Sequence, residues 1–232
     1  MLLNFNHELI GVEIIRSNRT TLCISIKEDG GVVVKAPQLL TEDKIRDIIN
    51  NKAEWILLKR KEVLKNQQKK LTREYVTGAT LPYMGKELPM EIIDCKKSSV
   101  IVENNRFIIH TPNKDEEYIQ KLLKKWYKKQ ALDYISRRVV CFSQKMHVSY
   151  ASISIKSRKK QWGSCDNHGN LTFSWRLIMA TEEAIDYVVV HELCHRKHMD
   201  HSKQFWCEVK KELSDYKERE KWLNDNSLNL ML

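Results

Sequence analysis

The chain has 232 residues, 42% of them hydrophobic, which is enough for one large domain or two small ones and excludes a disordered protein. The N-terminus lacks the basic-then-apolar layout of a signal peptide, and no apolar run approaches bilayer length. We therefore expect a cytoplasmic protein with no membrane partner. Six scattered cysteines without a C-x-x-C pair predict reduced thiols rather than a disulfide framework.

Basic residues outnumber acidic residues by 40 to 30, so the formal net charge is +10. Such an excess attracts nucleic acid or other anionic surfaces. Many of these residues, however, are lysines on expected helix faces, such as Lys124, Lys125, Lys128 and Lys129. We interpret them as solvated surface, and nucleic acid as a partner stays the second interpretation.

The first half of the chain begins with strands over residues 1 to about 37. A Gly30-Gly31 turn followed by three valines is typical of a hairpin. Thr41 is a good N-cap, and apolar residues then recur at helical spacing, which predicts one helix running into the lysine-rich stretch Lys65 to Lys70.

Short β-rich runs resume after Gly78 and continue to Thr111. The polar turn Thr111-Pro112-Asn113-Lys114 is the best candidate for a domain boundary. We accordingly expect an N-terminal α+β domain of uncertain role over residues 1–112, followed by a second domain over residues 113–232.

The second half opens with a long helix that starts at Asp115 and carries apolar residues along one side. Two strands are expected next, around the turn Asp166 to Asn170. Thr181 caps a further helix, with acidic residues in its first turn, and a final helix starts near Ser202. The fold class is therefore α+β.

The most informative segment is His191-Glu192-Leu193-Cys194-His195, which has the pattern H-E-x-x-H. Residues four apart on a helix lie one turn above each other, so both imidazoles can reach one zinc ion at about 2.0–2.1 Å. Glu192 is offset from them, where it can take a proton from a water activated by zinc. The alternative is a histidine-rich helix end that interacts with the helix dipole.

A catalytic zinc ion needs a third protein ligand. A straight helix would place His198 about 10 Å further along the axis than His191, too far to share an ion. His201 can join only if the helix ends and the chain turns back, and the sequence supports such a turn because Asp200 is a poor helix residue and Ser202 can cap a new helix. We favour His201 over His198.

Three segments of the sequence resemble those of a known family. The segment HELCHRKHMDHSKQFW looks like the signature of the YgjP-like predicted metallopeptidases, which are relatives of the SprT and WLM zincins. The segments SRKKQWGSCDNHGNLTFSWRLIMA and IRSNRTTLCISIKEDGGVVVKAP resemble further parts of that family, so the likeness spans nearly the whole chain.

The resemblance implies a β-rich N-terminal domain followed by a zincin-like catalytic domain, in which a small sheet lies beside an H-E-x-x-H helix. It also implies one zinc ion (Zn2+) per chain held by His191, His195 and His201, with Glu192 as the general base for hydrolysis of a peptide or protein substrate. The edge strand of the sheet, from Ser157–Ser164 or Leu171–Trp175, would bind an extended substrate by strand addition.

Three alternatives remain open at the level of sequence. The first is a non-catalytic zinc-binding module, although such a module does not need Glu192. The second is a DNA-associated protease like the SprT and WLM relatives, for which no nucleic-acid motif is found. The third is hydrolysis of a non-peptide amide. Candidates for the oxyanion stabiliser are Arg158, Tyr150 and His198, and the sequence carries no signal for the oligomeric state.

Overall fold

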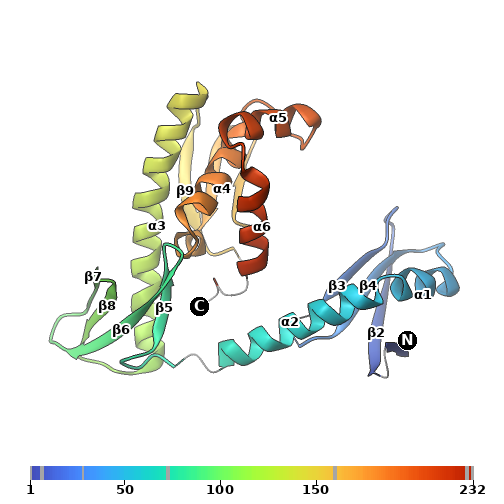
Figure 1. Ribbon diagram of the computed structural model, residues 1–232, viewed down its shortest axis with the longest axis horizontal. Helices are drawn as coiled ribbons and strands as arrows, with labels where there is room; N and C mark the ends of the chain where they lie inside the picture. The colour runs from blue at the N-terminus through green and yellow to red at the C-terminus, as the bar shows by residue number, and fades with distance from the viewer. Residues whose placement is uncertain are drawn as a thin grey trace. The chain divides into compact units, whose positions relative to one another are not determined.

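The computed structural model describes residues 2–5, 8–27, 29–71, 74–158, 161–227 and 230. These residues form three small sheets and six α-helices, so the expected mixed α+β class is confirmed (Figure 1). The chain divides into two compact units, Met1–Arg73 and Glu74–Leu232, each with a hydrophobic core of its own.

The first unit is a four-stranded sheet covered by two helices. Its strand order is β1-β2-β4-β3, with β2 and β4 parallel. The Gly30-Gly31 hairpin is confirmed, because β3 and β4 pair antiparallel and Gly30 adopts a φ of +80° in the turn. Its core is formed by apolar residues of β2, β4 and both helices. The elements are β1 (Leu2–Phe5), β2 (Glu8–Ser17), β3 (Cys23–Ile26), β4 (Val32–Pro37), α1 (Glu42–Asn50) and α2 (Ala53–Leu71).

The sequence predicted a single helix after Thr41, and this prediction is wrong because the segment forms two helices, α1 and α2. Helix α1 ends at Asn50, and Asn51 caps it with its backbone N–H directed at the carbonyls of Asp47 and Ile49. Consecutive asparagines at positions 50 and 51 weaken a helix, since their side chains compete for backbone hydrogen bonds. Thr41 is the N-cap residue by position, but its side chain makes no capping hydrogen bond.

The second unit is built along one long helix, α3 (Glu116–Met146), whose N-cap Asp115 accepts a hydrogen bond from the amide of Tyr118. Figure 1 shows the strands of one sheet beside one part of α3 and helix α4 beside another, with α5 and α6 packed on α4. That sheet has the order β5-β6-β8-β7. Its strands are β5 (Thr80–Tyr83), β6 (Lys86–Asp94), β7 (Ser99–Glu103) and β8 (Arg106–Thr111).

The division between the units falls after Arg73, not at residue 112 where the sequence predicted a boundary. The strands of residues 80–111 share one core with α3. Phe107 of β8 and Tyr127 of α3 are fully buried with their ring centroids 5.9 Å apart. The Tyr127 hydroxyl also donates to the Pro82 carbonyl at 2.7 Å. The polar turn at residues 111–114 is therefore a tight connection inside one core.

The third sheet lies beside the C-terminal helices and has the order β10-β11-β9. The expected hairpin around Asp166–Asn170 is formed by β10 and β11, while a third strand, β9, pairs parallel with β11. The remaining elements are β9 (Ser152–Lys156), β10 (Gly163–Cys165), β11 (Asn170–Ser174), the 3-10 helix η1 (Trp175–Met179), α4 (Glu182–Cys194), α5 (Lys203–Glu212) and α6 (Tyr216–Asn226).

Within the described residues, no helix offers a stretch both long and apolar enough to cross a membrane. All six cysteines are free thiols, as the sequence predicted. Five of them are at least partly exposed and lie far apart along the chain, and Cys194 is buried in α4.

The turn between β5 and β6 anchors the start of α4. The amides of Met84 and Gly85 donate to the carbonyls of Ile178 and Met179, both at 3.0 Å. Gly85 has a φ of +76°, and a Cβ there would lie 2.5 Å from Cγ2 and 3.1 Å from Cα of Thr181, the N-cap of α4. Glycine is therefore required both for the backbone conformation and for this close approach.

We expect Gly85→Ala to lower the free energy of unfolding by about 2 kcal/mol or more, because it adds a clash to the strain of a left-handed backbone. The matched control is Gly78→Ala, which has a φ of +95° but no atom within 4 Å of the added Cβ. It should cost less, and urea denaturation of the two variants measures the difference. Equal losses would show that the contact with Thr181 adds nothing.

Candidate metal centre

Helix α4 carries the H-E-x-x-H segment and is held in place by burial on nearly every side. The Thr181 side chain accepts a hydrogen bond from the Ala184 amide at 3.3 Å and so caps the helix as predicted. Val189, Val190 and Leu193 are fully buried. A helix that is apolar almost all round belongs in a protein core, so the residues at its C-terminal end are held on a rigid support.

The helix ends at Cys194, and His195 is its C-cap in a helical conformation. The amides of Arg196 and Lys197 donate to the carbonyls of Leu193 and Cys194, both at 3.0 Å. These i→i+3 bonds tighten the last turn, as is common at helix ends. His195 therefore keeps its position one turn above His191, while His198 leaves the helix.

The chain then reverses, as the sequence predicted. The Asp200 carboxylate accepts a hydrogen bond from the Ser202 amide at 3.3 Å. The Ser202 side chain in turn accepts from the Phe205 amide at 3.5 Å and caps α5. This turn brings His201 back to α4.

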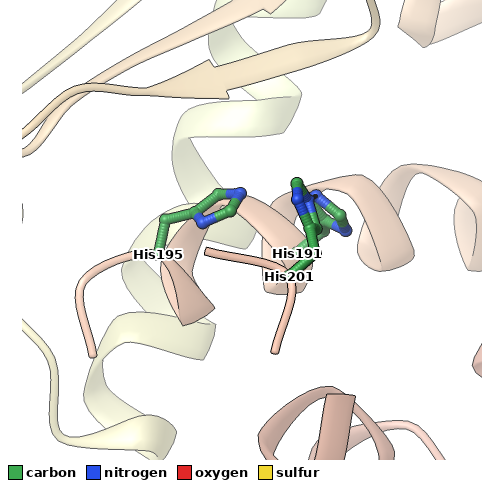
Figure 2. A group of neighbouring side chains, drawn as sticks. All are labelled: His191, His195 and His201. Atoms are coloured by element: carbon green, nitrogen blue, oxygen red, sulfur yellow. Dashed lines mark hydrogen bonds between the residues drawn. The ribbon is translucent and has the colours of Figure 1, made fainter. Parts of the chain in front are cut away.

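The imidazoles of His191, His195 and His201 come together, with one ring nitrogen of each within 4.8 Å of those of the other two. The Nε2 atoms of His191 and His201 lie 3.0 Å apart. Figure 2 shows the ring of His195 directed toward the pair formed by His191 and His201. The three predicted residues are thus gathered at one point, and His198 is not among them.

Phe205, the first large apolar residue of α5, supports all three imidazoles. Its ring centroid lies 4.9 Å from that of His191, 4.7 Å from that of His195 and 4.9 Å from that of His201. The Phe205 side chain is fully buried. Trp206 also contacts His191 and His201, with centroid distances of 5.8 Å, and stacks on Tyr216 of α6. The aromatic residues therefore fix the imidazoles from the side of α5.

The hydrogen bonds of the imidazoles define which nitrogen is available. Nδ1 of His195 lies 3.0 Å from the carbonyl oxygen of His198, which can only accept, so Nδ1 carries the proton and Nε2 is free. His198 thus takes part through its backbone and not through its ring. Nδ1 of His191 is buried and has no hydrogen-bond partner among the described residues.

Burial keeps the imidazoles in the unprotonated form. It lowers the pKa of His191 to about 3, with further lowering by His195 and His201. Burial also lowers the pKa of His195, against the hydrogen bond to His198. A neutral imidazole is the form that binds a metal ion.

The three histidines fit a zinc ion by donor chemistry and by spacing. Imidazole nitrogens are among the usual zinc ligands, and a catalytic site takes three protein ligands. Two nitrogens bound tetrahedrally at about 2.0–2.1 Å would lie roughly 3.3 Å apart. The 3.0 Å between His191 and His201 is close to that separation. Their role as ligands stays a prediction.

Glu192 lies between the two histidines of α4 and is 5% exposed. Burial raises the pKa of its carboxyl to about 8, although the positive charge of Arg158 acts in the opposite direction. The side chain packs directly on β10, since a Cβ at Gly163 would lie 2.6 Å from Oε1 and 2.7 Å from Cγ of Glu192. Gly163 therefore leaves the space that the Glu192 carboxylate occupies.

Two cysteines lie near the site, the buried Cys194 and the half-buried Cys165. Cys194 is fully buried, and burial raises the pKa of its thiol to about 12. Burial likewise raises the pKa of the Cys165 thiol, against the charge of Arg196. Both shifts disfavour the thiolate, which is the form that binds metal or attacks a substrate.

A cavity of about 210 Å3 opens beside His191 and Glu192. One wall comes from α4, including His191 and Glu192, and another comes from the segment that leads into β10. A third wall belongs to α6. The sequence predicted one final helix starting near Ser202 and did not distinguish α6 from α5. The lining residues are Gln161, Trp162, Gly163, Tyr187, Val188, His191, Glu192, Glu220, Leu223 and Asn224.

Of the two segments predicted as the substrate-binding sheet edge, Leu171–Trp175 is excluded. Its strand β11 is central and pairs on both sides, with β10 and with β9. The other segment, Ser157–Ser164, includes the start of β10, which is an edge strand and packs on α4 beside Glu192. Lys159 and Lys160 of this segment lie outside the described residues.

Comparison with known proteins defines the class as a metallopeptidase. A family model described as the YgjP-like metallopeptidase domain matches residues 20–226. Because the match covers most of the chain, including the H-E-x-x-H segment, this chain belongs to the YgjP-like family, as the sequence motifs predicted. No curated protein matches the chain at a significant level.

Two solved structures are similar to part of the chain, the metallopeptidase zymogens of Pyrococcus abyssi abylysin and Methanocaldococcus jannaschii jannalysin. Both are 21% identical over 39% of this chain, with a TM-score of 0.36, and the alignments cover 93% and 94% of those chains. The family assignment rests on the family model and not on these two structures.

The contacts of Phe205 predict that its ring is a major stabiliser of the site even without metal. We expect Phe205→Ala to lower the free energy of unfolding by about 3–5 kcal/mol, because it leaves a cavity beneath three imidazoles. Phe205→Leu keeps most of the volume and should cost less. Urea denaturation with a chelator present measures both, and a loss below about 1 kcal/mol for the alanine variant would contradict the packing described here.

Proposed function

We propose that this protein is a cytoplasmic zinc-dependent peptidase of the zincin type, with one zinc ion per chain held by His191, His195 and His201. The observation that carries the proposal is the meeting of three imidazole nitrogens within 4.8 Å, next to the buried carboxylate of Glu192. Its substrate is a peptide or protein, and residues 74–232 form the catalytic unit.

The ion, when bound, supplies Lewis-acid chemistry, polarising the scissile carbonyl and making water a better nucleophile. The Glu192 carboxylate takes the proton of the attacking water and delivers it to the leaving amine. Its burial against Gly163 excludes bulk water from that proton transfer. The His198 carbonyl holds His195 in one tautomer and orientation, with Nε2 toward the other two histidines.

The substrate backbone is placed along β10, the edge strand that packs on α4 beside Glu192. Strand addition gives main-chain hydrogen bonds that hold an extended peptide independently of its side chains. Of the three candidates for the oxyanion stabiliser, we favour Arg158, because its charge acts on Glu192. We do not favour His198, whose carbonyl oxygen already accepts a hydrogen bond from Nδ1 of His195.

A non-catalytic zinc module is less well supported, because a structural site needs no buried carboxylate beside its ligands. The DNA-associated alternative is suggested by the resemblance to SprT and WLM zincins and is permitted by the net charge of +10, to which the exposed lysines of α3 (Lys124, Lys125, Lys128 and Lys129) contribute. These lysines lie on a solvated helix face, and steeply salt-dependent DNA binding is the measurement that would favour this alternative.

The proposed metal site predicts the zinc content of the wild type and of two variants. We would measure it by plasma mass spectrometry after reconstitution and gel filtration. Wild type should hold one zinc per chain. His201→Ala should lose it, with affinity lowered more than about 100-fold, since even changes outside the ligand shell cost about 10–100-fold. His198→Ala is the matched control and should retain the zinc, because its contact with His195 is made by its backbone. Zinc lost from the His198 variant but kept by the His201 variant would overturn the ligand assignment.

The assigned role of Glu192 predicts a separation of activity from metal content. With a fluorescent casein substrate, Glu192→Gln should lower turnover on the order of 100- to 10,000-fold while zinc content stays at one per chain. Gly163→Ala should also lower turnover, because the added methyl group displaces the carboxylate.

The control for the glycine variant is Gly11→Ala, another strand glycine whose added Cβ meets no atom within 4 Å. It should behave as wild type. Full activity of zinc-loaded Glu192→Gln would show that another group moves the proton.

A further inference from the structure

The cavity beside His191 and Glu192 is too small for a whole ligand. Its volume is about 210 Å3, while small-molecule sites occupy roughly 300–1,000 Å3. It therefore accommodates part of a larger molecule, such as one side chain of a bound peptide. The wall shared with His191 and Glu192 places that side chain next to the reacting bond.

The walls of the cavity combine apolar surface with one carboxylate away from the histidines. Val188 is 4% exposed and Leu223 is 2% exposed, so both present firmly packed apolar groups. Trp162 adds a half-buried indole. The carboxylate belongs to Glu220 of α6, and Asn224 lies one turn further along the same helix.

Tyr187 fixes the place of the Glu220 carboxylate relative to the histidines. Its ring lies 5.9 Å from that of His191, one helical turn earlier on α4. Burial raises the pKa of the Tyr187 hydroxyl, and its interaction with Glu220 raises that pKa further. Because a helical turn advances about 5.4 Å, Glu220 lies roughly a side-chain length from the metal-binding end of α4.

The charges around the cavity favour a cationic occupant. The carboxylate of Glu220 lines it together with the acidic side chain of Glu192, and among the described lining residues none is lysine or arginine. Among the described residues, moreover, Glu220 has no ion pair. Lysine and arginine side chains combine an apolar stem with a charged head, which matches apolar walls that lead to a carboxylate.

We propose that this cavity is a substrate subsite for a lysine or arginine side chain beside the scissile bond, with Glu220 as the residue that determines this specificity. The inference deepens the peptidase function proposed above and rests on it for the identity of the ligand as a peptide. The apolar stem lies along Val188 and Leu223, and the cationic head pairs with Glu220.

The test measures binding separately from cleavage. Fluorescein-labelled alanine hexapeptides with one central Lys, Arg, Leu or Glu are titrated into full-length, zinc-loaded Glu192→Gln by fluorescence anisotropy. The Lys or Arg peptide should bind on the order of 10- to 100-fold more tightly than the Leu peptide, the range expected for a hydrogen bond to a charged group. Adding Glu220→Gln should remove this ratio, and Glu220→Lys should favour the Glu peptide.

Two controls separate specificity from stability. Glu218→Gln changes an exposed carboxylate of the same helix that does not line the cavity, and it should keep the ratio. Tyr187→Phe removes the hydroxyl that interacts with Glu220. It should therefore reduce the preference for the Lys or Arg peptide over the Leu peptide without abolishing it. If Glu220 acted only by holding α6 on α4, Glu220→Gln would lower the denaturation midpoint and leave the ratio unchanged.

Equal binding of the four peptides, or a ratio kept by Glu220→Gln, would overturn the subsite. Cleavage of the same peptides by zinc-loaded wild type is followed by mass spectrometry. Cleavage without any preference for Lys or Arg would overturn the subsite and leave the peptidase in place. Selective binding without cleavage of any peptide would instead contradict the peptidase and keep the cationic subsite.

Discussion

The site depends on the end of helix α4 at Cys194. Had the helix continued straight, residues after His195 would move away from His191 at about 1.5 Å per residue and could not share a metal ion with it. The i→i+3 bonds to Leu193 and Cys194, followed by the Asp200 and Ser202 turn, reverse the chain within six residues. The 3.0 Å contact between His191 and His201 is the consequence of that reversal.

Burial is the second constraint. It lowers the pKa of the imidazole of His191 and raises the pKa of the carboxyl group of Glu192. Desolvation disfavours the charged form, so it removes the proton from His191 and retains one on Glu192 in the metal-free chain. Unprotonated imidazoles accept a cation, and a nearby cation would favour the ionised carboxylate. The same dry environment therefore suits the histidines for a divalent ion and leaves Glu192 a proton to give up when that ion binds.

The elements that could be predicted from the sequence are those whose signals are local. The H-E-x-x-H pattern, the Thr181 cap and the Ser202 cap all lie within a few residues of the structure they specify. The packing of His201 on His191 was predictable for the same reason, because the turn between them is short. Membership of the YgjP-like family was also evident from contiguous motifs.

Features that depend on distant segments were not predictable from local patterns. The strand β9 pairs in parallel with β11, and such a pairing has no turn sequence to announce it. The polar turn at residues 111–114 resembled a linker, although Phe107 and Tyr127 on either side of it share one core. Phe205 lies in the first turn of the helix that the sequence predicted to start near Ser202, and nothing in its sequence context indicated that it contacts three imidazoles.

The proposed metal centre and the cavity beside it draw on different stretches of the chain. The proposed zinc ligands, the proposed general base Glu192 and Phe205 all lie within residues 191–205. The cavity is completed by Trp162 and by Glu220 and Leu223 of α6, and among the described residues none of these three forms a hydrogen bond with His191, His195 or His201. Because α6 meets α4 through side chains at Tyr187, the nature of the cavity can change without moving His191 or Glu192. If the proposed subsite holds, substitutions in α6 would change the choice of substrate while the proposed metal centre stays intact.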